Sequence, residues 1–124
     1  MEEITEENVD GFLDRINRLE GGCVEKIEIN LEKNSIFIIA YPEGAFVKCE
    51  MKLFGVQSFN INDPSGVEFI GLSGYPSSLE VTFDDRVVLI AIGANEALQD
   101  VESLKKSNFY VCADSLYATV RQEH

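Results

Sequence analysis

The chain has 124 residues, 45% of them hydrophobic, and its 22 acidic against 10 basic residues give a net charge of −12 at neutral pH. One ordinary domain has this length, and it buries enough apolar surface to fold without disulfides or metals. Such a negative field repels phosphate backbones and anionic lipid headgroups, which argues against a nucleic-acid-binding or membrane-surface protein. It attracts basic proteins instead, although the same acidity also serves solubility alone.

The cysteines and the N-terminal residues bear on the cellular compartment. Cys23, Cys49 and Cys112 lie far apart and form no Cys-x-x-Cys motif, which argues against a disulfide framework or a zinc site and predicts buried free thiols. The sequence begins Met-Glu-Glu, without the basic and apolar regions of a signal peptide. Its longest apolar run, residues 36–41, is too short to cross a bilayer. We therefore expect a single domain over residues 1–124 in the reducing cytoplasm.

Residues 5–20 are predicted to form an N-terminal helix. Thr5 is a suitable N-cap, because its hydroxyl can accept a hydrogen bond from an amide in the first turn. Gly21-Gly22 supplies the stop signal. Apolar residues recur at helical spacing between these limits, at Val9, Phe12, Leu13, Ile16 and Leu19.

The remaining chain, residues 23–121, is β-rich. Apolar and polar residues alternate over 27–31 and 47–53, and residues 36–41 are uniformly apolar, which predicts an antiparallel meander with 36–41 at its centre. Residues 79–83 and 87–92 are predicted to form a hairpin joined at Asp84-Asp85, and residues 109–112 and 116–120 a closing hairpin around 113–115.

Two further stretches complete the predicted fold. Residues 63–66 fit a type I turn before a short strand over 67–72, and residues 95–106 fit either a second short helix or an irregular excursion. The fold class is therefore α+β and mainly β: an antiparallel sheet or sandwich of about seven or eight strands with an N-terminal helix.

No catalytic, metal or cofactor motif is found in the sequence. The sole histidine, His124, is the last residue, whereas catalysis and metal binding need firmly held groups. Residues 71–74 lack the spacing of a nucleophile elbow, and no phosphate-binding glycine motif occurs. Residues 60–66 lack the glutamate that a calcium loop requires. Asp84 and Asp85 fit turn formation better than acid–base catalysis, although an enzyme using carboxylates alone stays an alternative.

Two phrases of the sequence carry a family resemblance. The first runs from Cys23 to Leu31 (CVEKIEINL) and continues, after a polar turn, with IFII at residues 36–39. The second, LFGVQSF at residues 53–59, is similar to a phrase of the form F-x-G-V-x-x-F. Over about residues 23–60 the chain resembles small bacterial proteins of the Immunity protein 50-like group. The resemblance implies a protein that neutralises a cognate toxin of a polymorphic toxin system.

The function predicted from these features is that of a non-enzymatic acidic protein that occludes a basic surface on a protein partner, such as a toxin. The candidate contact residues are Asp10 and Asp14 on the helix, and Asp84 and Asp85 at the hairpin. Glu3 and Glu7 share one predicted helix face with Asp10 and Asp14, because the spacings are four, three and four. An interface also needs a buried anchor, and the sequence does not distinguish its four tyrosines, Tyr41, Tyr75, Tyr110 and Tyr117.

Two other functions stay open at this point. A small β-barrel or sandwich could bind an apolar ligand in an internal pocket lined by Phe and Ile. A structural homodimer could instead bury an edge strand.

Overall fold

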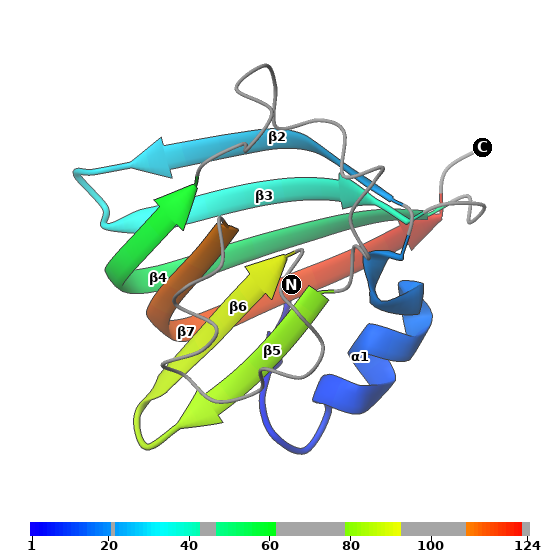
Figure 1. Ribbon diagram of the computed structural model, residues 1–124, viewed down its shortest axis with the longest axis horizontal. Coiled ribbons are helices and arrows are strands. Elements are labelled where there is room, and N and C mark those ends of the chain that lie inside the picture. Colours follow the sequence, from blue (N-terminus) through cyan, green and yellow to red (C-terminus); the bar gives the residue numbers. More distant parts are fainter. Residues whose placement is uncertain (21, 43–46, 62–78, 93–108, 123–124) are drawn as a thin grey trace.

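The computed structural model describes residues 1–20, 22–42, 47–61, 79–92 and 109–122 (Figure 1). In chain order, the elements are β1 (Glu2–Ile4), α1 (Val9–Arg15), the short 3-10 turn η1 (Asn17–Leu19), β2 (Cys23–Asn30), β3 (Ser35–Tyr41), β4 (Val47–Ile61), β5 (Leu79–Asp84), β6 (Val87–Ile92) and β7 (Phe109–Gln122). The predicted turn at 63–66, the strand at 67–72 and the second helix at 95–106 lie outside the described residues.

The strands form one open antiparallel sheet in the order β2-β3-β4-β7-β6-β5, with β1 beside β7. The α+β, mainly-β class is therefore confirmed, as are the β2-β3-β4 meander and the β5-β6 hairpin. Within the described part of the chain, the strands belong to this single sheet of seven.

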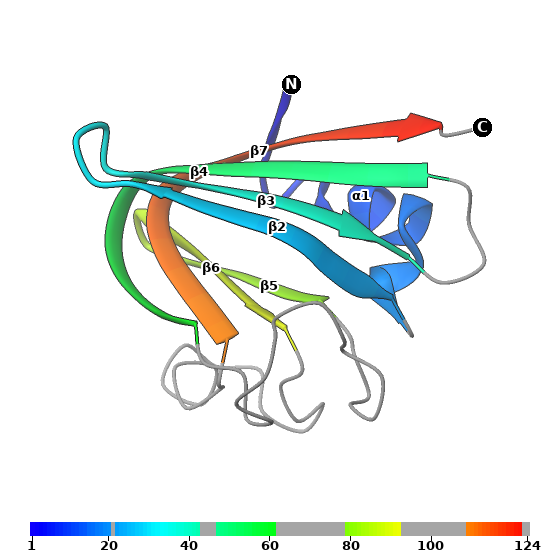
Figure 2. The same ribbon diagram turned by 90° about the horizontal axis from the view of Figure 1, so that it is seen from above.

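A sharp bend in the two longest strands folds the sheet over its own inner face (Figure 2). β4 and β7 pair along their whole length, from Val47 opposite Gln122 to Ile61 opposite Phe109. At the bend Gly55 has a φ of +67°, and the register shifts between Val56 and Ser58. Such an irregularity bends a strand and increases its twist. One half of the sheet therefore faces the other, and both halves contribute to the core.

The predicted closing hairpin at residues 109–120 is wrong, because this stretch is the single strand β7. Ala113 and Ser115 pair with Val56 and Phe54 on β4, so the ladder continues on both sides of Asp114. Turn-forming residues favour a reversal only where the chain is free to reverse. Here Ala113 and Ser115 stay paired with β4, so the turn-forming residues 113–115 form a bend within one strand instead of a chain reversal.

The N-terminal helix is shorter than predicted. α1 has seven residues and begins after Asn8, while Glu2–Ile4 forms β1 and Thr5 lies in the connection between them. Beyond α1 the backbone becomes left-handed, with φ values of 50°, 51° and 58° at Asn17, Arg18 and Leu19. This conformation buries Leu19 completely. Core packing thus overrides the helical spacing of the apolar residues.

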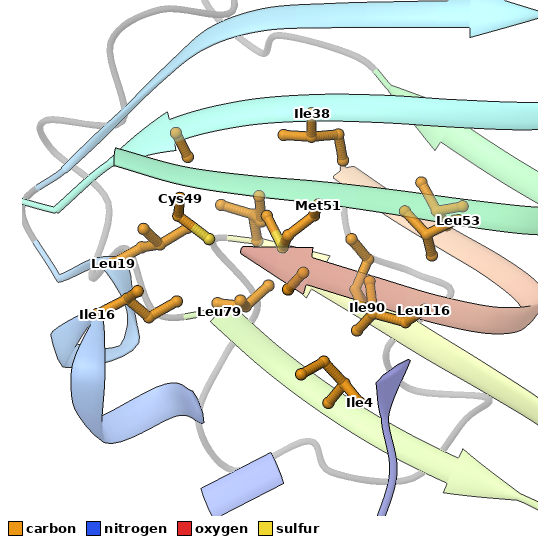
Figure 3. Close-up of a cluster of buried hydrophobic side chains, with 14 of the residues drawn as sticks. Ile4, Ile16, Leu19, Ile38, Cys49, Met51, Leu53, Leu79, Ile90 and Leu116 are labelled. Carbon is orange, nitrogen blue, oxygen red and sulfur yellow. The ribbon is translucent and has the colours of Figure 1, made fainter. Parts of the chain in front are cut away.

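The inner face of the sheet holds the hydrophobic core (Figure 3). Ile16 and Leu19 point toward Cys49 and Leu79, so α1 and η1 cover one end of this face. The largest side chains of this core with less than 2% exposure are Phe12, Ile16, Leu19, Ile36, Ile38, Met51, Leu53, Leu79, Ile90 and Leu116, whereas the equally buried Leu89 belongs to a second, smaller cluster. Each contributes about 1.5–3 kcal/mol by leaving water.

All three cysteines are free thiols, as predicted. Cys49 and Cys112 are buried, whereas Cys23 is partly exposed. Burial raises the pKa of the Cys49 thiol from 9.0 to about 12, opposed in part by Arg15 and aided by Glu50. Cys49 therefore stays protonated near neutral pH and is no nucleophile.

The raised pKa of Cys49 predicts a loss of stability in alkali. Between pH 9 and 12 the thiol ionises in the unfolded chain but not in the folded one. The folded state then binds the extra proton, so the free energy of unfolding falls by about 1.4 kcal/mol per pH unit in this window. Urea denaturation at successive pH values measures the slope. Cys49→Ala should lose this part of the slope and Cys23→Ala should keep it; equal slopes in both variants would contradict the assignment.

Candidate partner-binding notch

A notch of about 500 Å³ opens where β1, the β5-β6 hairpin and the bend of β7 meet. β1 and β6 both pair with β7 on the side away from β4, β6 up to Ala113 and β1 from Leu116 onward. The notch lies between them, beside Asp114 and Ser115. We call this hollow the acidic notch; its lining includes Glu3, Ile4, Thr5, Glu6, Glu7, Phe83, Asp85, Arg86, Val87, Val88, Asp114 and Ser115.

The first wall is the connection between β1 and α1, which carries Glu6 and Glu7. Asn8 braces this connection, because its Oδ1 accepts a hydrogen bond from the Thr5 amide at 2.7 Å and its Nδ2 donates to the Glu3 carbonyl at 2.8 Å. The Glu7 amide donates to the Thr5 hydroxyl at 3.3 Å. The wall is therefore a fixed turn that presents two exposed carboxylates.

The second wall is the turn between β5 and β6. The sequence placed the connection at Asp84-Asp85, but Asp84 ends β5 opposite Val87, and the turn itself is Asp85-Arg86. Asp85 has a φ of 54°, in the left-handed region that aspartate tolerates better than most residues. Both residues of this two-residue turn, Asp85 and Arg86, line the notch.

The third wall is the bend of β7 at Asp114. Gln57 Nε2 donates a hydrogen bond to Asp114 Oδ1 at 2.8 Å, which ties this carboxylate to β4. β4 and β7 are paired on both sides of the bend, so the sheet itself holds this wall in place.

Five acidic residues and one basic residue, Arg86, line the notch, and the carboxylate of one of the acids, Asp114, is turned toward Gly55 and Gln57 on β4. The ion pairs found among the described residues join Arg15 to Glu2, Lys26 to Glu28 and Arg121 to Glu50, and none involves a carboxylate of the notch. Apolar atoms of Ile4, Phe83, Val87 and Val88 contribute to its lining. The arrangement suits a cationic side chain with an aliphatic stem, such as lysine or arginine.

Of the four acids predicted as contact residues, one lies in the notch. Asp85 lines it, whereas Asp84, Asp10 and Asp14 are exposed and are not among its lining residues. The predicted helix face is also divided, because Glu3 belongs to β1 rather than to the helix. Sequence reasoning missed Glu6 and Asp114 as contact candidates, since only the fold brings them beside Asp85.

The tyrosines are now distinguished in part. Tyr117 is half-buried on the outer face of the sheet and packs edge-on against Phe54, with ring centroids 5.6 Å apart. It pairs with Glu3, which lines the acidic notch. Tyr41 and Tyr110 are also half-buried, on β3 and β7, and Tyr75 lies outside the described residues.

Among the described residues, His, Cys, Asp and Glu side chains form no group of three that could hold a metal ion. Within the same residues, no helix has the length and apolar character needed to cross a bilayer.

Comparison with known proteins gives no match to a family model, to a curated protein or to a solved structure.

Proposed function

We propose that this chain is a non-enzymatic acidic binding protein that docks onto a basic protein partner through the acidic notch. The observation that carries the proposal is that five acidic residues from three separate segments line one hollow together with apolar residues. Several acidic side chains around one hollow attract a cationic group of a partner. The net charge of −12 would also raise the rate of encounter with a basic partner.

In the cell, the proposed partner is a toxin. The side of the protein that carries the acidic notch would cover the basic active surface of this toxin. The resemblance of residues 23–60 to Immunity protein 50-like proteins supports this role, as does the predicted cytoplasmic location. The charge disfavours nucleic acid and anionic membrane as partners. A neighbouring gene whose product kills cells only when this chain is absent, and co-purifies with it, would support the toxin assignment. A co-purifying partner that is harmless alone would contradict it.

The other functions are less well supported by the described residues. The inner face of the sheet is filled by buried side chains, which disfavours an internal ligand pocket there. β2, at the edge of the described sheet, has a register irregularity at Glu25 and exposes Lys26 and Glu28, features that discourage pairing with a second edge. Asp84 and Asp85 are both exposed, whereas an acid–base pair needs environments that separate the two pKa values.

The proposal predicts salt-sensitive binding of a cationic probe at the notch. Acetyl-hexalysine amide, titrated into ¹⁵N-labelled protein at low salt, should shift the amide signals of Glu3, Glu6, Glu7, Asp85 and Arg86. Exposed acids elsewhere, such as Glu25 and Glu32, should shift much less. Affinity should fall at least about tenfold on raising ionic strength from 0.02 to 0.2 M, because added salt shortens the screening length. Shifts spread evenly over all acids would contradict the proposal, and hexaglutamine is the uncharged control.

A further inference from the structure

The outer face of the β2-β3-β4-β7 half of the sheet has a different charge pattern from the acidic notch. Alternation along the strands places four of the chain's ten basic residues on it, Lys26, Lys48, Lys52 and Arg121. Two of these are neutralised locally, since Lys26 pairs with Glu28 at 3.3 Å and Arg121 with Glu50 at 3.1 Å. The described residues form no ion pair with the other two, Lys48 and Lys52, so this face is less acidic than the notch.

A second, more open hollow of about 630 Å³ lies on the outer face and is lined by Met1, Lys52, Phe54, Ser115 and Tyr117. The rings of Phe54 and Tyr117 meet at 83° in an edge-to-face contact. Phe54 and Met1 remain 37% and 57% exposed. Aromatic residues and methionine are enriched in protein interfaces, and aromatic residues often form their energetic centre.

Lys52 is the cation of this hollow. Its Nζ lies 5.4 Å from the centroid of the Phe54 ring, and no described carboxylate comes within the 4.0 Å of a salt bridge. An ammonium over an aromatic face is held in place while its charge stays available. The Lys52 ammonium can therefore bind a carboxylate from outside the chain.

The two hollows adjoin. Ser115 lines both of them, and Glu3 in the lining of the acidic notch is the cross-strand neighbour of Tyr117 in the outer hollow. One partner segment that crosses β1 near the bend of β7 would contact both. Charge complementarity then requires that its own charge change sign along its length.

We infer that the basic partner also occupies the outer hollow, with a large apolar side chain against Phe54 and Tyr117 and an acidic group opposite Lys52. This inference rests on the proposed function, because it extends the footprint of the same partner. Along its length, the partner segment would therefore carry basic residues first, then an apolar residue and then an acidic residue. A uniformly basic surface would fill the notch but would be repelled by Lys52.

A bipartite peptide and matched control peptides test the inference. The bipartite probe has three lysines, a four-residue Gly-Ser spacer and then Leu-Glu, and is made in both chain directions; its control ends in Ser-Ser instead. The better bipartite probe should bind about tenfold more tightly than its control, since the second contact is tethered. Phe54→Ser should remove that gain. Lys52→Glu should also remove the gain in affinity. On that variant, a probe ending in Leu-Lys should bind more tightly than the control again.

The outcomes separate the two proposals. If hexalysine fails to bind the notch, the proposed function itself is wrong. Hexalysine could bind the notch while the bipartite probe binds no more tightly than its control and the Lys52→Glu variant does not prefer the Leu-Lys probe. In that case the outer hollow is not part of the partner's footprint. Phe54 is exposed, so Phe54→Ser should fold normally, and an unchanged denaturation midpoint verifies this.

Discussion

Replacing Gly55 by alanine is expected to lower the free energy of unfolding by about 2–5 kcal/mol. A φ of +67° costs a residue with a Cβ roughly 1–2 kcal/mol. The new Cβ would also overlap the Asp114 side chain, whose Cγ and Cβ would lie 2.7 and 2.9 Å away. Overpacking of this kind costs about 1–3 kcal/mol. Urea denaturation followed by circular dichroism measures the loss.

The chain offers a matched control in Gly11. It lies in α1, and a Cβ added there would meet nothing within 4 Å, so Gly11→Ala should stabilise the protein by about 0.5–1 kcal/mol. Asp114→Gly should partly rescue Gly55→Ala, because it removes the overlapping atoms and leaves only the backbone strain. If Gly55→Ala is tolerated as well as Gly11→Ala, the bend does not depend on glycine.

Reversing the charge of Glu6, Glu7 and Asp85 to lysine is expected to slow association of a cationic partner by at least about tenfold. Electrostatic steering accelerates binding by about 10–1000-fold, and these are three of the five acidic residues that line the notch. The change moves the net charge from −12 to −6, since each reversal adds two. Stopped-flow measurement with labelled hexalysine at low salt gives the on-rate.

Local and global charge are separated by a second triple variant. Glu20, Glu25 and Glu32 are exposed and lie outside the notch lining, so their reversal to lysine changes the net charge equally. This variant should keep most of the on-rate. An Asp10→Lys/Asp14→Lys variant tests the pair predicted from the sequence, and it too should bind nearly as fast as the parent. Equal slowing in all three would mean that only the total charge matters.

The sequence predicts most of the strands, because their signals are local. Alternation and apolar runs identify β2, β3, β5 and β6 to within a few residues. They fail at β7, where Asp114 looks like a turn and only the partner strand β4 shows that it is a bend. They fail again at Asn17, Arg18 and Leu19, since nothing local marks three left-handed residues.

The site is predicted less well than the fold, for the same physical reason. Asp85 was identified because a tight turn is visible in the sequence, but Glu6 and Asp114 come from segments more than a hundred residues apart. Tyr117 was one of four equal candidates until its pairing with Lys52 placed it on the outer face. Charge and composition predict a surface for a basic partner, whereas the place of the candidate residues in the fold depends on long-range pairing.

The position of β7 in the chain has a consequence for synthesis on the ribosome. β7 is made after every other described strand, yet β1, β4 and β6 all pair with it. β4 must therefore wait for residues 109–122 to emerge before its long ladder can close, and non-local pairing of this kind is slow. The walls of the acidic notch meet only through β7, so the nascent chain forms the proposed binding surface in the same step that completes the described sheet.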